Sequence, residues 1–156
     1  MGDVARGWTT VMIIAQLVTS FIAAAGFGVL FNAPKRALIQ CGLVGMFGWI
    51  LYYLLVETGM DAVPATTCGA ILVAVLSQVC GKLYKTPIIV FNVSGIIPLV
   101  PGGVAYDAMR HFVENDYYTA VQLSAKVMLL AGAIAIGLMF SEVVNQLVKK
   151  ITSSGA

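Results

Sequence analysis

The chain has 156 residues, of which 60% are hydrophobic and only 10% are charged, and its formal net charge is +2. Soluble domains carry about 25% charged residues, so this composition excludes an ordinary soluble domain and predicts an all-α polytopic integral membrane protein. The small net charge gives no support for a nucleic-acid partner, and we expect the lipid bilayer to surround the chain.

Five apolar segments follow one another and predict a single transmembrane domain over residues 1–156. About 20 apolar residues in a helix cross a hydrocarbon core of ~30 Å. The first segment is expected to be a retained span, because MGDVARGW lacks the basic region of a signal peptide. The predicted spans are residues 8–31, 37–56, 63–81, 86–101 and 119–148.

The second segment carries a row of small residues. Gly42, Gly45 and Gly48 lie three residues apart and so drift slowly around one side of a helix. Such a row predicts a groove in which a neighbouring helix packs closely. Gln16 and Gln78 are polar side chains within spans, and we expect them to hydrogen-bond between helices.

The charges of the links predict an orientation. Residues 32–36, 82–85 and 149–150 are basic, whereas residues 57–61 and 114–116 are acidic. If five segments alternate across the membrane, the three basic regions share one side. The positive-inside rule then places the N-terminus outside and the C-terminus in the cytoplasm, for a multi-pass protein of the cell inner membrane. If the fourth segment is re-entrant, the chain has four spans and the C-terminal assignment reverses.

The fourth segment is interrupted. Residues 86–103 read TPIIVFNVSGIIPLVPGG, with Pro98 and Pro101 followed at once by Gly102 and Gly103. Proline removes a backbone donor and clashes with the preceding turn, and a broken helix survives in hydrocarbon only where protein or a wet cavity surrounds it. Two interpretations stand: a solute site like those at the broken helices of transporters, or a kinked helix with a packing role.

Residues 104–114 predict an amphipathic helix after this break. Its polar side carries Tyr106, Asp107 and Arg110, and the last two are spaced to pair. In one interpretation, Gly102, Gly103 and the first backbone amides of this helix bind an anion, such as a solute carboxylate. In the other, the helix lies at the outer membrane surface.

Two further polar side chains fall within predicted spans. Asn92 either lines a cavity or hydrogen-bonds a neighbouring helix. Lys126 either snorkels to the outer interface, or stays inside to counter a solute carboxylate or to pair with Asp107. The candidate solute-binding residues are Asn92, Pro98, Pro101, Gly102, Gly103, Tyr106, Asp107, Arg110 and Lys126.

The first link has a simple explanation and a functional one. Asn32 and Pro34 suit the cap and first turn of the second helix, and Lys35 and Arg36 suit a cytoplasmic link. Alternatively, Asn32 and Arg36 gate the cytoplasmic mouth of a solute path.

No pattern in the sequence supports an enzyme. His111 is the sole histidine and has no metal-ligand spacing beside it, and the three cysteines fall in apolar segments. There is no nucleophile elbow, phosphate-binding loop or zinc-binding His-Glu motif. We therefore expect no catalytic residues, no metal and no cofactor.

Two motifs resemble a known family. GFGVLFNAPKRALIQCGLVG at residues 26–45 and IIPLVPGGVAYDAM at residues 96–109 resemble the threonine/serine exporter family, in its small, YjjB-like component. That component corresponds to the C-terminal membrane half of the full-length exporters. The resemblance covers essentially the whole chain.

The resemblance implies a function and a partner. Members export small carboxylates across the cytoplasmic membrane, with threonine and serine as namesake substrates, and split pairs are also associated with dicarboxylates such as succinate. A larger membrane subunit would supply the first membrane half, which agrees with the odd number of predicted spans. A homo-oligomer, and a membrane scaffold that transports nothing, remain the alternatives.

Overall fold

The computed structural model describes the backbone of residues 2–154 and the surroundings of side chains 12–143 and 146. Helices account for 88% of the chain, and no strand occurs in the described part. The prediction of an all-α polytopic membrane protein is therefore confirmed. The elements are α1 (Gly2–Leu30), η1 (Lys35–Ala37), α2 (Leu38–Glu57), α3 (Ala62–Tyr84), α4 (Ile88–Ile96), η2 (Ile97–Leu99), α5 (Gly102–Val113) and α6 (Tyr117–Ser154).

The ends of the long helices follow from local chemistry. α1 ends as Asn32 enters the left-handed region with φ 54°, and Pro34 then directs the chain into η1. α2 ends before Gly59, whose φ of 89° a residue with a side chain rarely adopts. Asp61 opens α3, where its side chain accepts the amide hydrogen of Ala62 at 2.8 Å.

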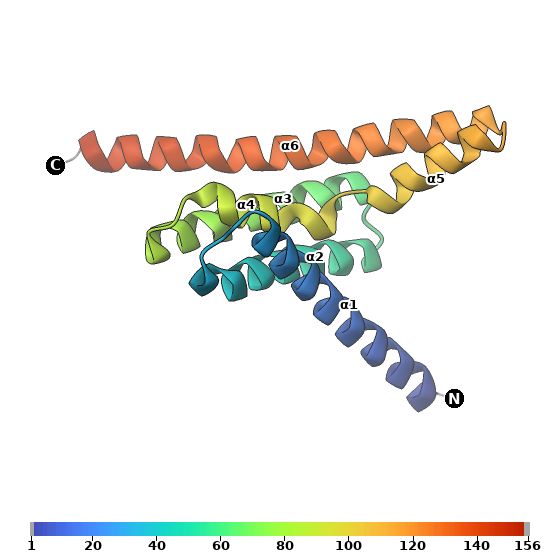
Figure 1. Cartoon of the computed structure of the whole chain (residues 1–156), viewed down its shortest axis with the longest axis horizontal. Helices are drawn as coiled ribbons and strands as arrows, with labels where there is room; N and C mark the ends of the chain where they lie inside the picture. Colours follow the sequence, from blue (N-terminus) through green and yellow to red (C-terminus); the bar gives the residue numbers. More distant parts are fainter. Residues whose placement is uncertain (1, 155–156) are drawn as a thin grey trace.

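The interrupted segment forms two short helices and a turn of 3₁₀ helix. Pro98 sits inside η2 and Pro101 directly precedes α5, so two amide donors that a continuous helix would need are missing. The α4–η2 unit and α5 meet at an angle of 53°. Because this is a bend and not a reversal, the chain continues from α4 into α5 in the same general direction (Figure 1).

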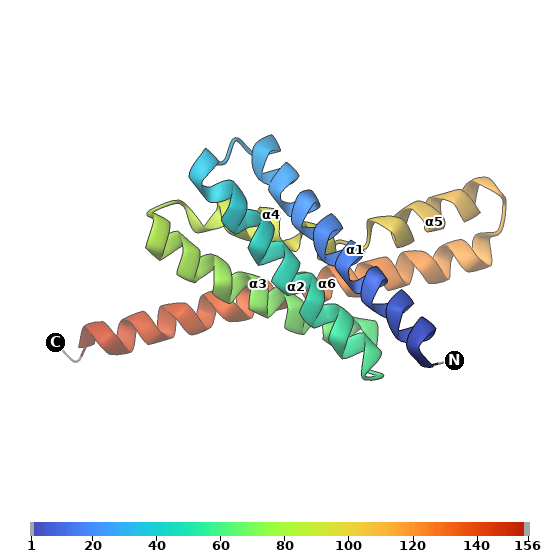
Figure 2. The same cartoon turned by 90° about the horizontal axis from the view of Figure 1, so that it is seen from below.

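The helices form a bundle around α2, α3 and α4. α1 packs mainly on α2. The first part of α6 pairs with α5, and the helix then runs along α3 (Figures 1 and 2). Val44, Val73 and Leu99 form the centre of the apolar core, from α2, α3 and η2. The turn at the break is therefore part of the core.

The predicted glycine groove exists, and it receives three neighbours. A side chain at Gly42 would collide with Phe21 of α1, and one at Gly45 would collide with Ala24 of α1. One at Gly48 would collide with Val73 of α3. Small residues on α2 therefore bring α1 and α3 close to its backbone.

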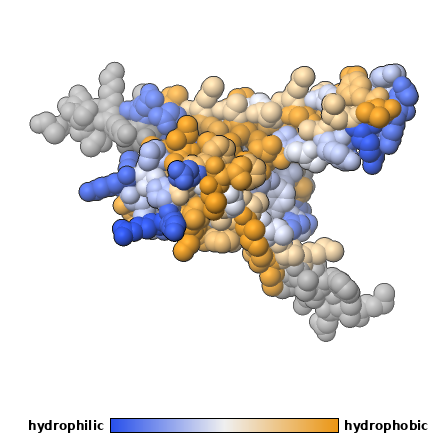
Figure 3. Space-filling model, viewed as in Figure 1, coloured by the Kyte–Doolittle hydropathy of each residue, from blue (hydrophilic) through white to orange (hydrophobic). Residues whose placement is uncertain are grey.

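Links of like charge gather at the same end of the bundle. The α1–α2 and α3–α4 links lie at one end, together with the C-terminal end of α6 (Figure 1). The α2–α3 and α5–α6 links lie at the other end (Figure 1). Hydrophobic residues cover the middle of the face in Figure 3, and hydrophilic residues lie towards both ends. The α4–α5 unit therefore runs from the basic end of the molecule to the acidic end.

In the part of the chain that the structure describes, four helices are long and apolar enough to cross a membrane, and the bent pair would make a fifth crossing. Neither half of the pair is long enough alone, since α4 has 9 residues and α5 has 12. The four long candidates are Met12–Leu30, Lys35–Glu57, Ala62–Tyr84 and Tyr117–Val143.

Candidate functional site: a pocket at the broken helix

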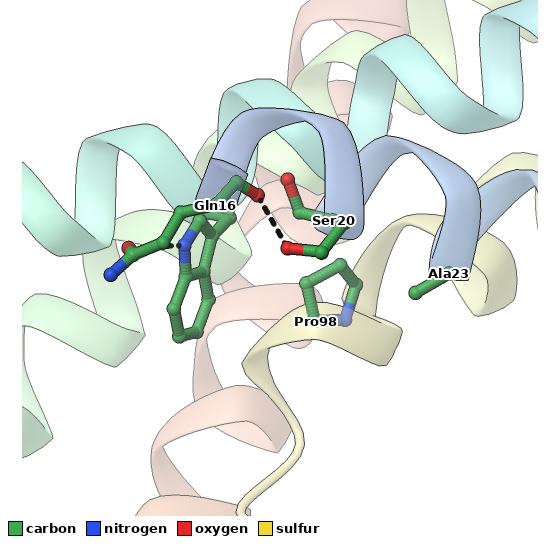
Figure 4. Close-up of a pocket in the computed structure, with 6 residues that line it drawn as sticks. Gln16, Ser20, Ala23 and Pro98 are labelled. Atoms are coloured by element: carbon green, nitrogen blue, oxygen red, sulfur yellow. Dashed lines mark hydrogen bonds between the residues drawn. The ribbon is translucent and has the colours of Figure 1, made fainter. Parts of the chain in front are cut away.

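A pocket of about 220 Å³ lies where α1, α2 and η2 meet. Pro98 supplies one wall from the break, and Trp49 supplies another from α2. In Figure 4, Pro98 faces the side of α1 that carries Ser20 and Ala23. The residues that line the pocket are Gln16, Thr19, Ser20, Ala23, Trp49 and Pro98.

Polar groups concentrate on the α1 wall of this pocket. The indole Nε1 of Trp49 donates a hydrogen bond to Gln16 Oε1 at 3.1 Å, which ties α2 to α1. The hydroxyl of Thr19 donates to the carbonyls of Ala15 and Gln16, and that of Ser20 donates to Leu17 at 3.0 Å. Since each hydroxyl hydrogen is used within the helix, the oxygens offer acceptor lone pairs.

The pocket lies near the middle of the candidate spans. The midpoint of Met12–Leu30 is Phe21, and that of Lys35–Glu57 is Met46. Pro98 likewise lies close to the centre of the bent pair, Ile88–Val113. The binding sites of many secondary transporters lie near the bilayer midplane, at discontinuous helices.

No acidic or basic residue occurs in the stretches that wall the pocket. Residues 12–30, 38–56 and 88–103 contain no Asp, Glu, Lys or Arg. The pocket therefore has a mostly apolar lining with a few polar groups on its α1 wall, and it carries no charge.

The break brings some of the predicted site residues to the pocket and leaves others away from it. Pro98 lines the pocket directly. Asn92 lies in α4, where its Oδ1 is buried without a hydrogen-bond partner among the described residues. Pro101 precedes α5, and Gly102 and Gly103 are exposed in its first turn with open space beside them.

The polar residues of α5 lie towards the acidic end of the molecule. Tyr106 is 69% exposed, and Asp107 is partly buried. The Arg110 guanidinium lies 3.6 Å from the Glu114 carboxylate, so Arg110 pairs with Glu114 at i,i+4 and not with Asp107, the partner that we considered from the sequence. Lys126 of α6 is exposed.

A second pocket of about 220 Å³ lies between α5 and α6, which otherwise pack against each other. Small and apolar side chains form most of its wall, and Ser124 is its polar member. The residues that line it are Ala105, Ala108, Met109, Ser124, Val127 and Met128.

The two residues proposed as a gate lie at the basic end, in the α1–α2 link. Asn32 and Arg36 are both exposed there. Among the described residues, no group of three or more His, Cys, Asp or Glu side chains is arranged to hold a metal ion.

The α1 wall of the pocket is the part that sequence reasoning missed. Gln16 was interpreted as a helix–helix hydrogen-bond residue, and its bond to Trp49 confirms that interpretation. The signal for a site was that Gln16, Thr19 and Ser20 fall at i, i+3 and i+4 in an apolar helix, and so share one face.

The fold and the pocket define a class: a polytopic helical membrane protein with a discontinuous helix beside a mostly apolar pocket near the middle of its candidate spans. A family model described as "Threonine/Serine exporter, ThrE" matches residues 16–144 of the chain. The chain belongs to this family of exporters, as the two sequence motifs indicated. No solved structure matches the chain.

Proposed function

We propose that this chain is the membrane subunit of a secondary exporter that moves small carboxylates, of the threonine and serine type, out of the cell. Membership of the threonine/serine exporter family supports an exporter-type transporter. The observation that carries the proposal is the break at Pro98, which forms one wall of a mostly apolar pocket near the middle of the candidate spans. A packing kink alone would not require such a pocket.

The proposed transporter also needs a larger membrane subunit of the same family. Five crossings cannot contain a complete inverted repeat, and a second unit of opposite orientation would complete one. The helices at the edge of the bundle carry large exposed apolar side chains, which lipid and a second subunit could both cover. Examples are Ile22 and Val29 of α1, and Met128, Ile136 and Met139 of α6.

The proposed orientation places the basic end of the bundle in the cytoplasm and the N-terminus outside, in the cell inner membrane. The charge separation between the two ends supports this orientation through the positive-inside rule. Asn32 and Arg36 then lie at the cytoplasmic mouth, where we propose that they gate entry. Asp107, Arg110 and Lys126 are the corresponding proposed residues on the outward path.

Dicarboxylate export is less well supported than amino-acid export. A succinate dianion would enter a pocket whose walls carry no basic residue, and an uncompensated charge in a low dielectric is costly. The scaffold alternative leaves the pocket at the break without a role.

Solute release from loaded cells tests the proposed function. Cells are preloaded with threonine, serine or succinate, and they express this chain alone or together with the larger subunit. We expect accelerated release of threonine and serine when both chains are present. If both proteins reach the membrane and the release of all three solutes stays at the background rate, the exporter proposal is refuted.

A further inference from the structure

We propose that His111 is a proton-controlled latch at the corner between α5 and α6. In its protonated form it binds the Asp116 carboxylate and holds α5 against α6, and in its neutral form it lets the two helices separate. The latch goes beyond the proposed function, because it concerns the helices after the break and does not depend on which solute is exported.

The latch acts on a part of the molecule that the bundle holds loosely. α5 and the first part of α6 extend beyond the other helices at the acidic end (Figures 1 and 2). We call residues 102–113 and 117–128 the α5–α6 arm. α5 packs on α6 and makes few contacts with any other element. The position of α5 therefore depends mainly on how firmly α6 holds it.

The contact between the two helices of the arm is incomplete. The pocket of about 220 Å³ lies between them, and Ala105 and Ala108 contribute only methyl groups to its wall. At the start of α5, Gly102 and Gly103 are exposed and have open space beside them. Glycine adopts backbone conformations that other residues avoid, so this pair is suited to be a hinge. The corner at the far end of α5 is thus its firmest attachment.

Backbone hydrogen bonds build this corner. The Asp116 amide donates to the His111 carbonyl at 2.9 Å. The Asn115 amide donates to Phe112 at 3.3 Å, and Asn115 is left-handed with φ 62°, which completes a Schellman motif. Asp116 then caps α6, since its Oδ1 accepts the amide hydrogen of Thr119 at 3.3 Å. One residue therefore both ends α5 and starts α6, and its side chain lies beside the imidazole.

The imidazole of His111 is placed so that a proton would strengthen the corner. Its Nδ1 is buried and has no hydrogen-bond partner among the described residues. The same nitrogen lies 3.4 Å from Asp116 Oδ2 and 3.8 Å from Glu114 Oε2. Protonation makes both ring nitrogens donors and puts a positive charge beside two carboxylates. It also puts that charge at the C-terminal end of α5, where the helix dipole favours a cation.

The other ionisable groups near the corner do not replace this pair. Among the described residues, the carboxylates within 4 Å of the imidazole are those of Glu114 and Asp116, so Asp107, one turn earlier, is not a partner. Glu114 is shared with Arg110, which lies 3.6 Å from it. From α6 the nearby titratable groups are two tyrosines, and the first charged residue of that helix is distant along the chain: Tyr117, Tyr118 and Lys126.

The pH range of the latch follows from its two groups. An imidazole ordinarily titrates near about pH 6.5, so its charge is present below that pH and is lost as the pH rises through it. Hydrogen bonds from Thr119, and the nearby His111, hold the pKa of Asp116 below its usual value of 3.8. The carboxylate is therefore ionised throughout the range in which the imidazole is charged. The closed arm should be favoured between about pH 4 and pH 6, and the favour should be lost above about pH 7.

Distances between two spin labels on the arm test the latch. With the three native cysteines replaced by alanine, Tyr106→Cys and Leu129→Cys place one label on α5 and one on α6, at positions that are 69% and 60% exposed. Pulsed electron paramagnetic resonance on the full chain in lipid nanodiscs gives the distances at about pH 5.5 and about pH 7.5, on either side of the imidazole titration. We expect the ratio of short to long distances to be about two- to fivefold higher at the lower pH, as for a partly exposed ion pair.

Two substitutions separate the latch from a general effect of pH. His111→Gln cannot be protonated, and Asp116→Asn removes the negative charge but keeps a good N-cap residue. Each variant should give the same distances at both pH values. The matched control is Glu57→Gln, which neutralises a carboxylate at the same end of the molecule, in the last turn of α2. It should keep the full response to pH.

Circular dichroism and melting curves establish that each variant is folded. The proposal is overturned if the labelled protein without further substitutions shows the same distances at both pH values. It is also overturned if folded His111→Gln or Asp116→Asn keeps the response, or if Glu57→Gln loses it, because a general effect of charge at this end would then explain the change. The measurement uses no solute, so its failure leaves the proposed export function untouched.

Discussion

Gly45 lies where α1, α2 and the broken segment meet. A Cβ at this position would collide with that of Ala24 and would lie 3.4 Å from both the Gly95 carbonyl oxygen and Pro98 Cγ. We predict that Gly45→Ala lowers the free energy of unfolding by about 1–3 kcal/mol, because overpacking forces neighbouring backbones apart. Denaturant unfolding in mixed micelles measures this change.

Gly26 is the matched control for this substitution. It lies on the same α1 helix as Ala24, and no atom comes within 4 Å of a Cβ built on it. Gly26→Ala should leave stability unchanged or raise it slightly, because alanine has the higher helix propensity. Equal destabilisation by both substitutions would show that close approach at Gly45 is not the cause.

Asp116, in the α5–α6 link, gives a prediction about pH. Hydrogen bonds from the side chain and the backbone N–H of Thr119 hold the pKa of this carboxyl below its usual value of 3.8, and the nearby His111 lowers it further. A lowered folded-state pKa contributes stability above the unfolded pKa, and that contribution disappears as pH falls through the folded value. Wild-type Tm should therefore fall more than that of Asp116→Asn as pH is lowered below about 4.

Because Asp116 is exposed, the difference in Tm should be small and should shrink at high salt. Parallel Tm curves for the two proteins across this pH range would contradict the prediction.

At the scale of elements, the break between α4 and α5 is the feature on which transport should depend. We predict that Pro98→Ala with Pro101→Ala restores the missing amide donors, favours a continuous helix and removes the pocket wall. Threonine efflux should fall at least tenfold, while membrane insertion and assembly with the larger subunit are unchanged. Efflux assays with blots of the assembled complex measure both quantities.

Pro64→Ala is the control for proline replacement. Pro64 is exposed in the first turn of α3, where a proline interrupts no hydrogen bond. Its replacement should leave efflux unchanged. If the double variant at the break exports at the wild-type rate in a normally assembled complex, the break has no role in transport.

The elements were largely predictable from sequence, because their signals are local. Pro98 and Pro101 predicted the interruption, and Gly45 and its neighbours predicted close helix packing. Local signals also explain the limit of the prediction. Gln16, Trp49 and Pro98 lie in three separate segments, and they share a pocket only because the groove on α2 brings α1 onto it. The pattern of residues within one segment cannot predict a contact between three segments.

The bend between α4 and α5 was not predictable either. The prolines indicated where the helix stops, but not the direction in which the chain continues. A return to the same side would have left the two links on either side of this segment at one end of the bundle. The 53° bend instead carries the chain from the α3–α4 link to the α5–α6 link at the opposite end (Figure 1).

At the scale of the whole molecule, the two ends should face opposite sides of the membrane. In a variant whose three native cysteines are replaced by alanine, single cysteines are introduced by Lys85→Cys and Asp116→Cys. Lys85 and Asp116 lie in the links before α4 and after α5. We predict that a membrane-impermeant thiol reagent labels the Asp116→Cys protein in intact cells, and labels the Lys85→Cys protein only after permeabilisation.

Labelling of both positions from the same side would show that the α4–α5 unit is re-entrant. The chain would then cross the membrane four times, and the argument for an inverted partner unit would fail. Labelling of Lys85→Cys alone in intact cells would reverse the proposed orientation but would keep the five crossings.

The most direct measurement is solute release from proteoliposomes that contain this chain and the proposed larger subunit, loaded with equal concentrations of threonine and succinate. A solute path at the broken helix predicts that threonine is released well above the rate of protein-free liposomes, that succinate is not, and that Pro98→Ala with Pro101→Ala abolishes most of the threonine release. Release of succinate in preference to threonine, or release of threonine that this double substitution leaves unchanged, would contradict amino-acid export past this break.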